Sequence, residues 1–300
     1  MMCLVTSTPR EASPVDHWLA ALRSISNLHF GAAIGNDKSG SIHFDVNIDS
    51  LRTGDPPLQQ PEPAVLQAVP DLPCWLAFDV ETNDLVPSPP SNIEWTYGKF
   101  GHQCRLGHAS LENLRMVQLG WCMQLPNCTD IKSKTYNIIP DGFDITSAAE
   151  SKHHISKADL QESGRPLRHV LDEFLLDVLA IINVGGAVCA HQLEFDAAII
   201  AVELEEAGLH NKLALWEQTV QDGICTMNPD VSKWSCQIYF DVAAAPSFAG
   251  RANAVGICNM ILALLPTEYK CIEQHHDAGV DAQMVCKLVG ELQRRLERYR

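Results

Sequence analysis

The chain has 300 residues, of which 46% are hydrophobic and 20% are charged, which is an ordinary globular composition. No apolar run reaches the roughly 18–20 residues that a membrane-spanning helix needs, so we expect no membrane association. The formal net charge of −15 argues against long-range capture of duplex nucleic acid, because non-specific affinity for a duplex comes from neutralising its phosphates with Lys and Arg.

The cysteines and the N-terminus indicate the compartment. The 11 cysteines are an odd number and include no C-x-x-C pair, a pattern typical of reduced thiols in an intracellular protein. No cationic flank precedes an apolar core at the N-terminus, and Glu11 and Asp16 argue against a transit peptide. We therefore expect an intracellular protein of the cytoplasm or nucleus.

The first 72 residues differ from the rest. Apolar spacing predicts one amphipathic helix over 18–28, and alternation predicts one strand over 42–48. Residues 54–73 are rich in proline, which is typical of a linker. We interpret residues 1–72 as an N-terminal extension of unknown role and residues 73–300 as the main domain.

The segment from Cys74 to Thr82 is predicted to be a buried strand that ends in two carboxylates, Asp79 and Glu81. Residues two apart on a strand project to the same side. Placing two like charges together is favourable only if a cation lies between them, and paired hard oxygen ligands suit Mg²⁺ or Mn²⁺.

Residues 83–113 form a long, polar, Pro-rich passage that we expect to be an insertion loop. Its aromatic and basic residues fit stacking on unpaired nucleobases, and they fit equally well a loop that packs its aromatics against its own domain. Strands are predicted over 115–122 and 134–140, paired by a short turn.

The second half alternates helices with short strands. Helices are predicted over 170–179, 191–208, 252–265 and 281–298, and strands over 187–190 and 223–227. The order indicates a mixed α/β layer structure in which helices connect the later strands.

Three further residues stand at positions suited to chemistry. Asp196 lies in the first turn of a helix that leaves an apolar strand, Asp281 begins the last helix, and His276 precedes Asp281 by five residues. Each also has an ordinary structural explanation, as a helix N-terminal acid, an N-cap and a surface histidine.

In combination these positions resemble the DEDDh (DnaQ-like) family of 3′→5′ exonucleases, within the ribonuclease H-like superfamily. The motif D-x-E is matched at 79–81, H-x-x-x-F-D at 191–196 and H-x-A-x-x-D-A at 276–282. The resemblance covers about residues 73–295. A further similarity, His-x-Ile-Ser, has a histidine at position 154 where the family commonly has glycine.

The resemblance implies a fold, a site and an activity. The fold is a ribonuclease H-like mixed five-stranded sheet flanked by helices. In the implied site, two divalent ions (Mg²⁺ or Mn²⁺) are held by four carboxylates, those of Asp79, Glu81, Asp196 and Asp281. The implied general base is His276. The implied contacts to the terminal nucleotide come from Thr82, His191 and Phe195. Asp79 is the candidate to bridge both ions, and His275 is the alternative base. The implied substrate is a single-stranded DNA or RNA 3′ end, cleaved to nucleoside 5′-monophosphates.

The sequence departs from the family pattern at two places, which limits which family contacts can be assigned to this chain. Gln192 stands where the second motif usually has Asn, and residues 83–113 replace a connection that is normally short. One alternative is a nuclease-like domain that binds nucleic acid or a partner protein without cleaving. Another is an enzyme that trims RNA rather than editing DNA, a choice that depends on how the 2′-hydroxyl is handled.

Overall fold

The computed structural model describes residues 34–36, 42–44, 61, 63–85, 114–126, 131–228, 231, 256–265, 268 and 275–300. The chain divides into two compact units, Met1–Leu58 with Asp241–Gly250, and Gln59–Phe240 with Arg251–Arg300. The described residues of the first unit form an antiparallel pair, β1 (Ile34–Asn36) and β2 (Ile42–Phe44). The strand predicted over 42–48 is therefore confirmed for three residues, and the helix predicted over 18–28 lies outside the described residues.

The second unit contains a five-stranded mixed sheet in the order β5-β4-β3-β6-β7. Its strands are β3 (Trp75–Thr82), β4 (Met116–Gln124), β5 (Ile131–Asn137), β6 (Ala187–Ala190) and β7 (Ile224–Cys225). β3, β4 and β5 are antiparallel neighbours, whereas β6 and β7 run parallel to β3. The predicted architecture, a mixed five-stranded sheet flanked by helices, is confirmed.

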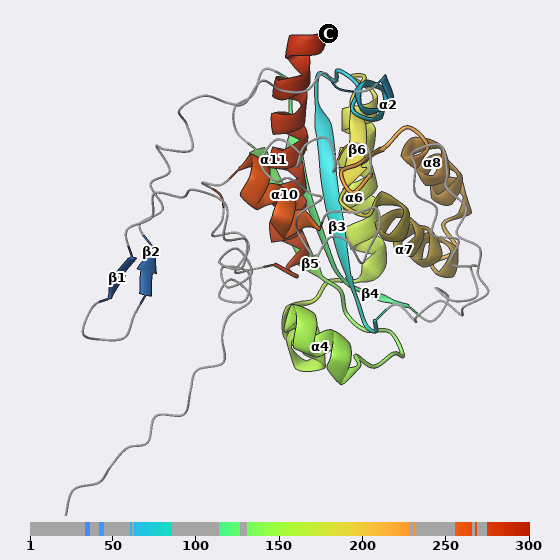
Figure 1. The fold of residues 1–300 in the computed structure, drawn as a ribbon. Helices are drawn as coiled ribbons and strands as arrows, with labels where there is room; N and C mark the ends of the chain where they lie inside the picture. Colours follow the sequence, from blue (N-terminus) through green and yellow to red (C-terminus); the bar gives the residue numbers. More distant parts are fainter. Residues whose placement is uncertain are drawn as a thin grey trace, which may run out of the picture. The chain divides into compact units, whose positions relative to one another are not determined.

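Helices cover both faces of this sheet (Figure 1). One face carries α6 (Leu167–Ile182), α7 (Leu193–Glu206) and α8 (His210–Val220), and α10 (Ile257–Leu264) and α11 (Ala278–Leu296) lie on the other. A 3₁₀ turn, η4 (Glu297–Tyr299), follows α11. The predicted helices differ from these mainly at their ends. α6 is longer than predicted, and α11 begins three residues before Asp281.

Four described helices were not predicted. They are α2 (Pro63–Ala68), α4 (Ser147–His153), α5 (Lys157–Ser163) and α8. α4 and α5 are short and polar, and caps define them more than apolar spacing does. Thr146 accepts a hydrogen bond from the Ala149 N–H, and Ser156 forms a capping box with Asp159. α2 lies within the predicted linker, and Val65 and Val69 near it are buried.

Side chains of β3 alternate between the two faces of the sheet, so that one set packs in the core and the other set faces the candidate site. Leu76, Phe78 and Val80 belong to the main hydrophobic cluster, which also contains buried residues of α6, α7 and α8. On the opposite face, the Trp75 indole N–H donates to the Cys286 carbonyl of α11 at 3.1 Å. Asp79 and Glu81 are an even number of positions from Trp75 and therefore project to the same face of the sheet, toward α11.

Two glycines let α11 approach the sheet closely. A Cβ on Gly120 of β4 would lie 2.2 Å from the backbone carbon of Ala278, and a Cβ on Gly279 would lie 1.9 Å from the Thr135 hydroxyl oxygen. Gly120 is also the β4 residue opposite Asp79. The first turn of α11 is therefore packed against the sheet at the level of Asp79.

In the part of the chain that the structure describes, no helix combines the length and apolar character needed to cross a bilayer. The described cysteines are all free thiols: Cys74, Cys122, Cys189, Cys225, Cys258 and Cys286.

Candidate active site

The predicted carboxylates of β3 meet the last helix. Asp79, Glu81 and Asp281 each place one carboxylate oxygen within a group whose atoms all lie within 4.8 Å of one another. Asp281 is only 4% exposed. Residues 200 positions apart in the sequence are thus brought together, as the resemblance implies.

The first turn of α11 orients Asp281. The helix begins at Ala278 and its N-cap is Asp277, whose side chain accepts a hydrogen bond from the Val280 N–H at 3.0 Å. The alternative in which Asp281 is the N-cap is therefore wrong, because the Asp281 N–H already donates to the Asp277 carbonyl within the helix. This leaves the Asp281 carboxylate available for the site.

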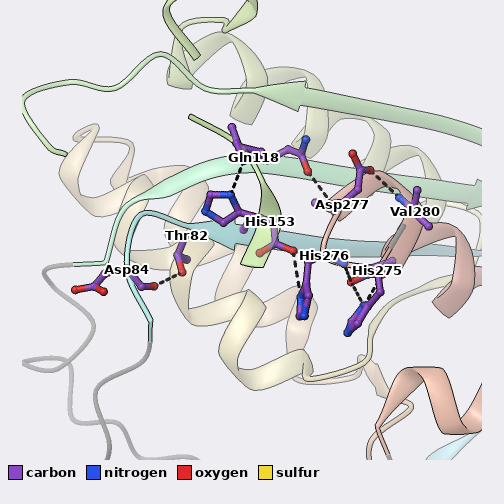
Figure 2. A network of polar contacts seen from close by, with 12 residues as sticks. Thr82, Asp84, Gln118, His153, His275, His276, Asp277 and Val280 are labelled. Atoms are coloured by element: carbon purple, nitrogen blue, oxygen red, sulfur yellow. Dashed lines mark hydrogen bonds and ion pairs between the residues drawn. The ribbon is translucent and has the colours of Figure 1, made fainter. Parts of the chain in front are cut away.

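Gln118 of β4 holds this turn in place, as Figure 2 shows. Its side-chain oxygen accepts from the Ala278 N–H at 2.7 Å, and its side-chain nitrogen donates to Asn137 at 3.0 Å. Gln118 was not among the predicted site residues. The available signal was a polar amide inside an otherwise apolar predicted strand.

Asp196 enters from α7 and is 3% exposed. Its Oδ2 atom is buried without a hydrogen-bond partner in the described part of the chain. It does not belong to the 4.8 Å group, yet its charge acts on that group by raising the pKa values of Asp79 and Glu81. An acid that served only to stabilise the helix N-terminus would not need a buried, unsatisfied oxygen.

Burial and mutual repulsion disfavour ionisation of Asp79, Glu81 and Asp196. The pKa of Asp79 is raised well above its usual value by burial and then by the charges of Asp196, Asp281 and Glu81. Burial and Asp281 likewise raise the pKa of Asp196. Burial, Asp281 and Asp196 raise the pKa of Glu81 to about 8. We refer to Asp79, Glu81, Asp196 and Asp281 together as the carboxylate set.

The carboxylate set fits a hard divalent cation. It offers only carboxylate oxygens, the donors that Mg²⁺ and Mn²⁺ prefer. The unsatisfied Oδ2 of Asp196 is an acceptor for which the described residues supply no donor. A bound cation would compensate both the repulsion and the missing partner.

The two adjacent histidines differ in their carboxylate partners and in their pKa values. His275 Nδ1 lies 2.8 Å from Asp281 Oδ2, whereas His276 Nδ1 lies 4.0 Å from Glu81 Oε1 (Figure 2). Burial lowers the pKa of His275, but hydrogen bonds to Asp281 and Cys258 outweigh this effect and raise it to about 10. Burial and the neighbouring charge of His275 lower the pKa of His276 to about 4.

The predicted substrate-contacting residues lie at the ends of β3 and β6. Thr82 ends β3, and its hydroxyl donates to the Asp84 carbonyl at 2.8 Å. His191 follows β6, with Nδ1 2.9 Å from the Thr226 hydroxyl. Phe195, in the first turn of α7, is partly buried against the main core.

The C-terminal end of α4 also borders the site, which sequence reasoning did not resolve. His153 is buried, and its Nδ1 accepts from the Ile155 N–H at 3.0 Å. Figure 2 shows its ring between Thr82 and His276. His154 follows with φ of 59°, a left-handed conformation that favours glycine, and this explains why glycine suits that position.

No protein-family model matches this chain, and no curated protein does either. Solved structures that match this chain include a zinc-bound complex of E. coli Exonuclease I with single-stranded DNA, at 12% identity and a TM-score of 0.49, covering 75% of this chain and 42% of that one. Cell-death related nuclease 4 gives 12% identity and a TM-score of 0.41, covering 76% and 64%. A full-length 3′-exonuclease gives 7% identity and a TM-score of 0.37, covering 76% and 83%.

This chain therefore spans about two fifths of the length of Exonuclease I.

Proposed function

We propose that this chain is a metal-dependent 3′→5′ exonuclease of the DEDDh type that acts on single-stranded DNA or RNA ends. The observation that carries the proposal is the convergence of carboxylates from three separate segments, with three of them inside one 4.8 Å group. The −15 net charge favours a substrate held locally at this site over a long duplex captured by a basic surface.

The carboxylate set, Asp79 included, would hold two divalent ions, Mg²⁺ or Mn²⁺. When bound, such ions lower the pKa of the attacking water and compensate charge on the departing 3′ oxygen. The protein otherwise supplies orientation and proton transfer. Thr82, His191 and Phe195 are the residues we assign to the terminal nucleotide, and the product is a nucleoside 5′-monophosphate.

His276 is our candidate for the general base. A base must be unprotonated before it accepts a proton, and the pKa of about 4 keeps His276 neutral at pH 7. His275, with a pKa of about 10, already carries a proton at that pH. In the metal-free chain the protonation states therefore favour His276 over His275, in agreement with the spacing to Asp281.

We further propose that residues 73–300 form the exonuclease domain, that residues 1–72 are an N-terminal extension and linker of unknown role, and that residues 83–113 modify access to the site. We place the protein inside the cell.

Digestion of 5′-labelled single-stranded DNA and RNA, with Mg²⁺, Mn²⁺ or EDTA, tests the activity. We expect a ladder that shortens from the 3′ end and disappears in EDTA, and the faster ladder identifies the preferred nucleic acid. Folded protein that binds metal but cleaves neither strand would instead support a binding module.

A further inference from the structure

Glu203 of α7 is a buried acid that the proposed reaction does not use. Its side chain is 1% exposed, compared with 20% for the side chain of Arg115. Arg115 donates to both of its oxygens at 3.0 Å, and the Met116 N–H donates to Oε1 at 2.7 Å. We call this group, Glu203 with Arg115 and the Met116 N–H, the Glu203 anchor.

The anchor is attached where β3 and β4 meet at the site. The Asn83 N–H donates to the Arg115 carbonyl at 2.9 Å, and the Arg115 N–H donates to the Asn83 side chain at 2.7 Å. The β3–β4 register shifts between Glu81 and Thr82, and such irregularities are common beside active sites. Glu203 therefore ties α7 to the strand pair two residues beyond Glu81.

Asp196 and Glu203 share one side of α7, because residues seven apart are separated by nearly two full turns. The spacing corresponds to about 10 Å along the helix axis. At the N-terminal end of this face, Asp196 is 3% exposed and its Oδ2 atom has no hydrogen-bond partner among the described residues. At the other end of the same face, the Glu203 anchor fixes α7 to the start of β4.

We propose that Glu203 and Arg115 are positioning residues that hold Asp196 within the carboxylate set. This inference rests on the proposed function, since it assigns Asp196 to a metal site. The bidentate hydrogen bonds from the Arg115 guanidinium and the additional backbone N–H donor fix both the position and the orientation of the Glu203 carboxylate. Residues outside the ligands that orient them commonly change metal affinity by about 10–100-fold when removed.

The test is calorimetric titration of the full chain with Mn²⁺ alone, without substrate. We expect Glu203→Ala to weaken Mn²⁺ binding about 10–100-fold. In cleavage assays it should lower kcat while leaving KM near the wild-type value, because the substrate contacts are unchanged. Arg115→Lys keeps a cation beside Glu203 and leaves the Met116 bond in place, so its Mn²⁺ affinity should lie closer to the wild-type value.

Asp177→Asn is the matched control. Asp177 of α6 pairs with Lys134 of β5 at 2.7 Å and so also joins a helix to the sheet, but not through α7. It should lower the unfolding temperature and leave Mn²⁺ affinity unchanged. A folded Glu203→Ala protein with wild-type Mn²⁺ affinity would overturn the positioning role.

If Glu203→Ala does not fold, the double variant Arg115→Leu, Glu203→Leu removes both charges together and leaves neither unpaired. Weakened Mn²⁺ binding by the folded double variant supports the inference, and wild-type affinity overturns it. A wild-type chain that binds no Mn²⁺ overturns both this inference and the proposed function. A wild-type chain that binds Mn²⁺ but cleaves nothing overturns the proposed function alone, and the affinities of the variants still decide the positioning role.

Discussion

Each end of α7 carries a buried acid, and the two acids differ in whether the chain supplies partners for their oxygens. Glu203 accepts three hydrogen bonds and faces a guanidinium. Asp196, 3% exposed, retains an oxygen without a partner, and the charge that acts on it most strongly is that of another acid, Asp281. One acid is fully compensated by the chain, whereas the other is not.

This is the difference that we expect between an acid that holds the fold together and an acid that binds a cation. A buried charge must be paired or must bind a cation, because leaving it uncompensated costs free energy. Where the chain supplies the partner, the acid holds the fold together. Where the chain places more acids instead, the compensation has to come from outside, which is how the carboxylate set indicates a metal.

The largest expected effect is loss of activity when a member of the carboxylate set is removed. Asp79→Ala or Asp281→Ala should abolish metal-dependent hydrolysis while the circular dichroism spectrum stays that of the folded protein. Removing either acid takes away one of the three carboxylates of the 4.8 Å group, which we propose to be metal ligands. Undiminished cleavage by either variant would refute the two-ion assignment.

The histidines should differ next. His276→Ala should lower turnover about 10²–10⁴-fold if it is the general base. His275→Ala removes a partner of Asp281 rather than the base and should reduce turnover less. Single-turnover rates at saturating Mg²⁺ measure both, and the reverse ranking would mean that His275 is the base.

Stability should change with opposite sign at the two ends of α7. In EDTA, Glu203→Ala should destabilise the protein by about 3–5 kcal/mol, because it breaks a buried pair. Asp196→Asn should raise the unfolding temperature by about 2–4 °C, the shift expected for relief of roughly 1 kcal/mol of repulsion. Thermal denaturation of both variants tests this, and a destabilised Asp196→Asn protein would contradict the comparison.

The smallest effect is a pH dependence of metal binding. Because the pKa of Glu81 is raised to about 8 in the metal-free protein, Glu81 is protonated below that pH and must lose its proton to bind a cation. Mn²⁺ affinity should therefore rise with pH, about tenfold per unit between pH 6 and 8 if one proton is released. Titration calorimetry in two buffers of different ionisation enthalpy measures the release. An affinity independent of pH would contradict it.

Much of the sheet and all the members of the carboxylate set could be predicted from the sequence. β3 has a strong apolar pattern, and the local spacing of Asp79 and Glu81 places them on one side of it. Helices such as α4 were missed because cap hydrogen bonds of Thr146, rather than a long apolar stripe, define their limits.

Local pattern limits which residue types can meet, since strand and helix periodicity fixes the face on which each side chain lies. The packing of the fold selects which distant groups become partners. Gln118 and the Ala278 N–H are 160 residues apart, and Glu203 and the Met116 N–H are 87 apart. The roles of His275 and His276 likewise depend on where Asp281 and Glu81 lie. Hydrogen bonds and charge interactions of this kind follow from packing, because they require atoms within a few ångströms that no local pattern brings together.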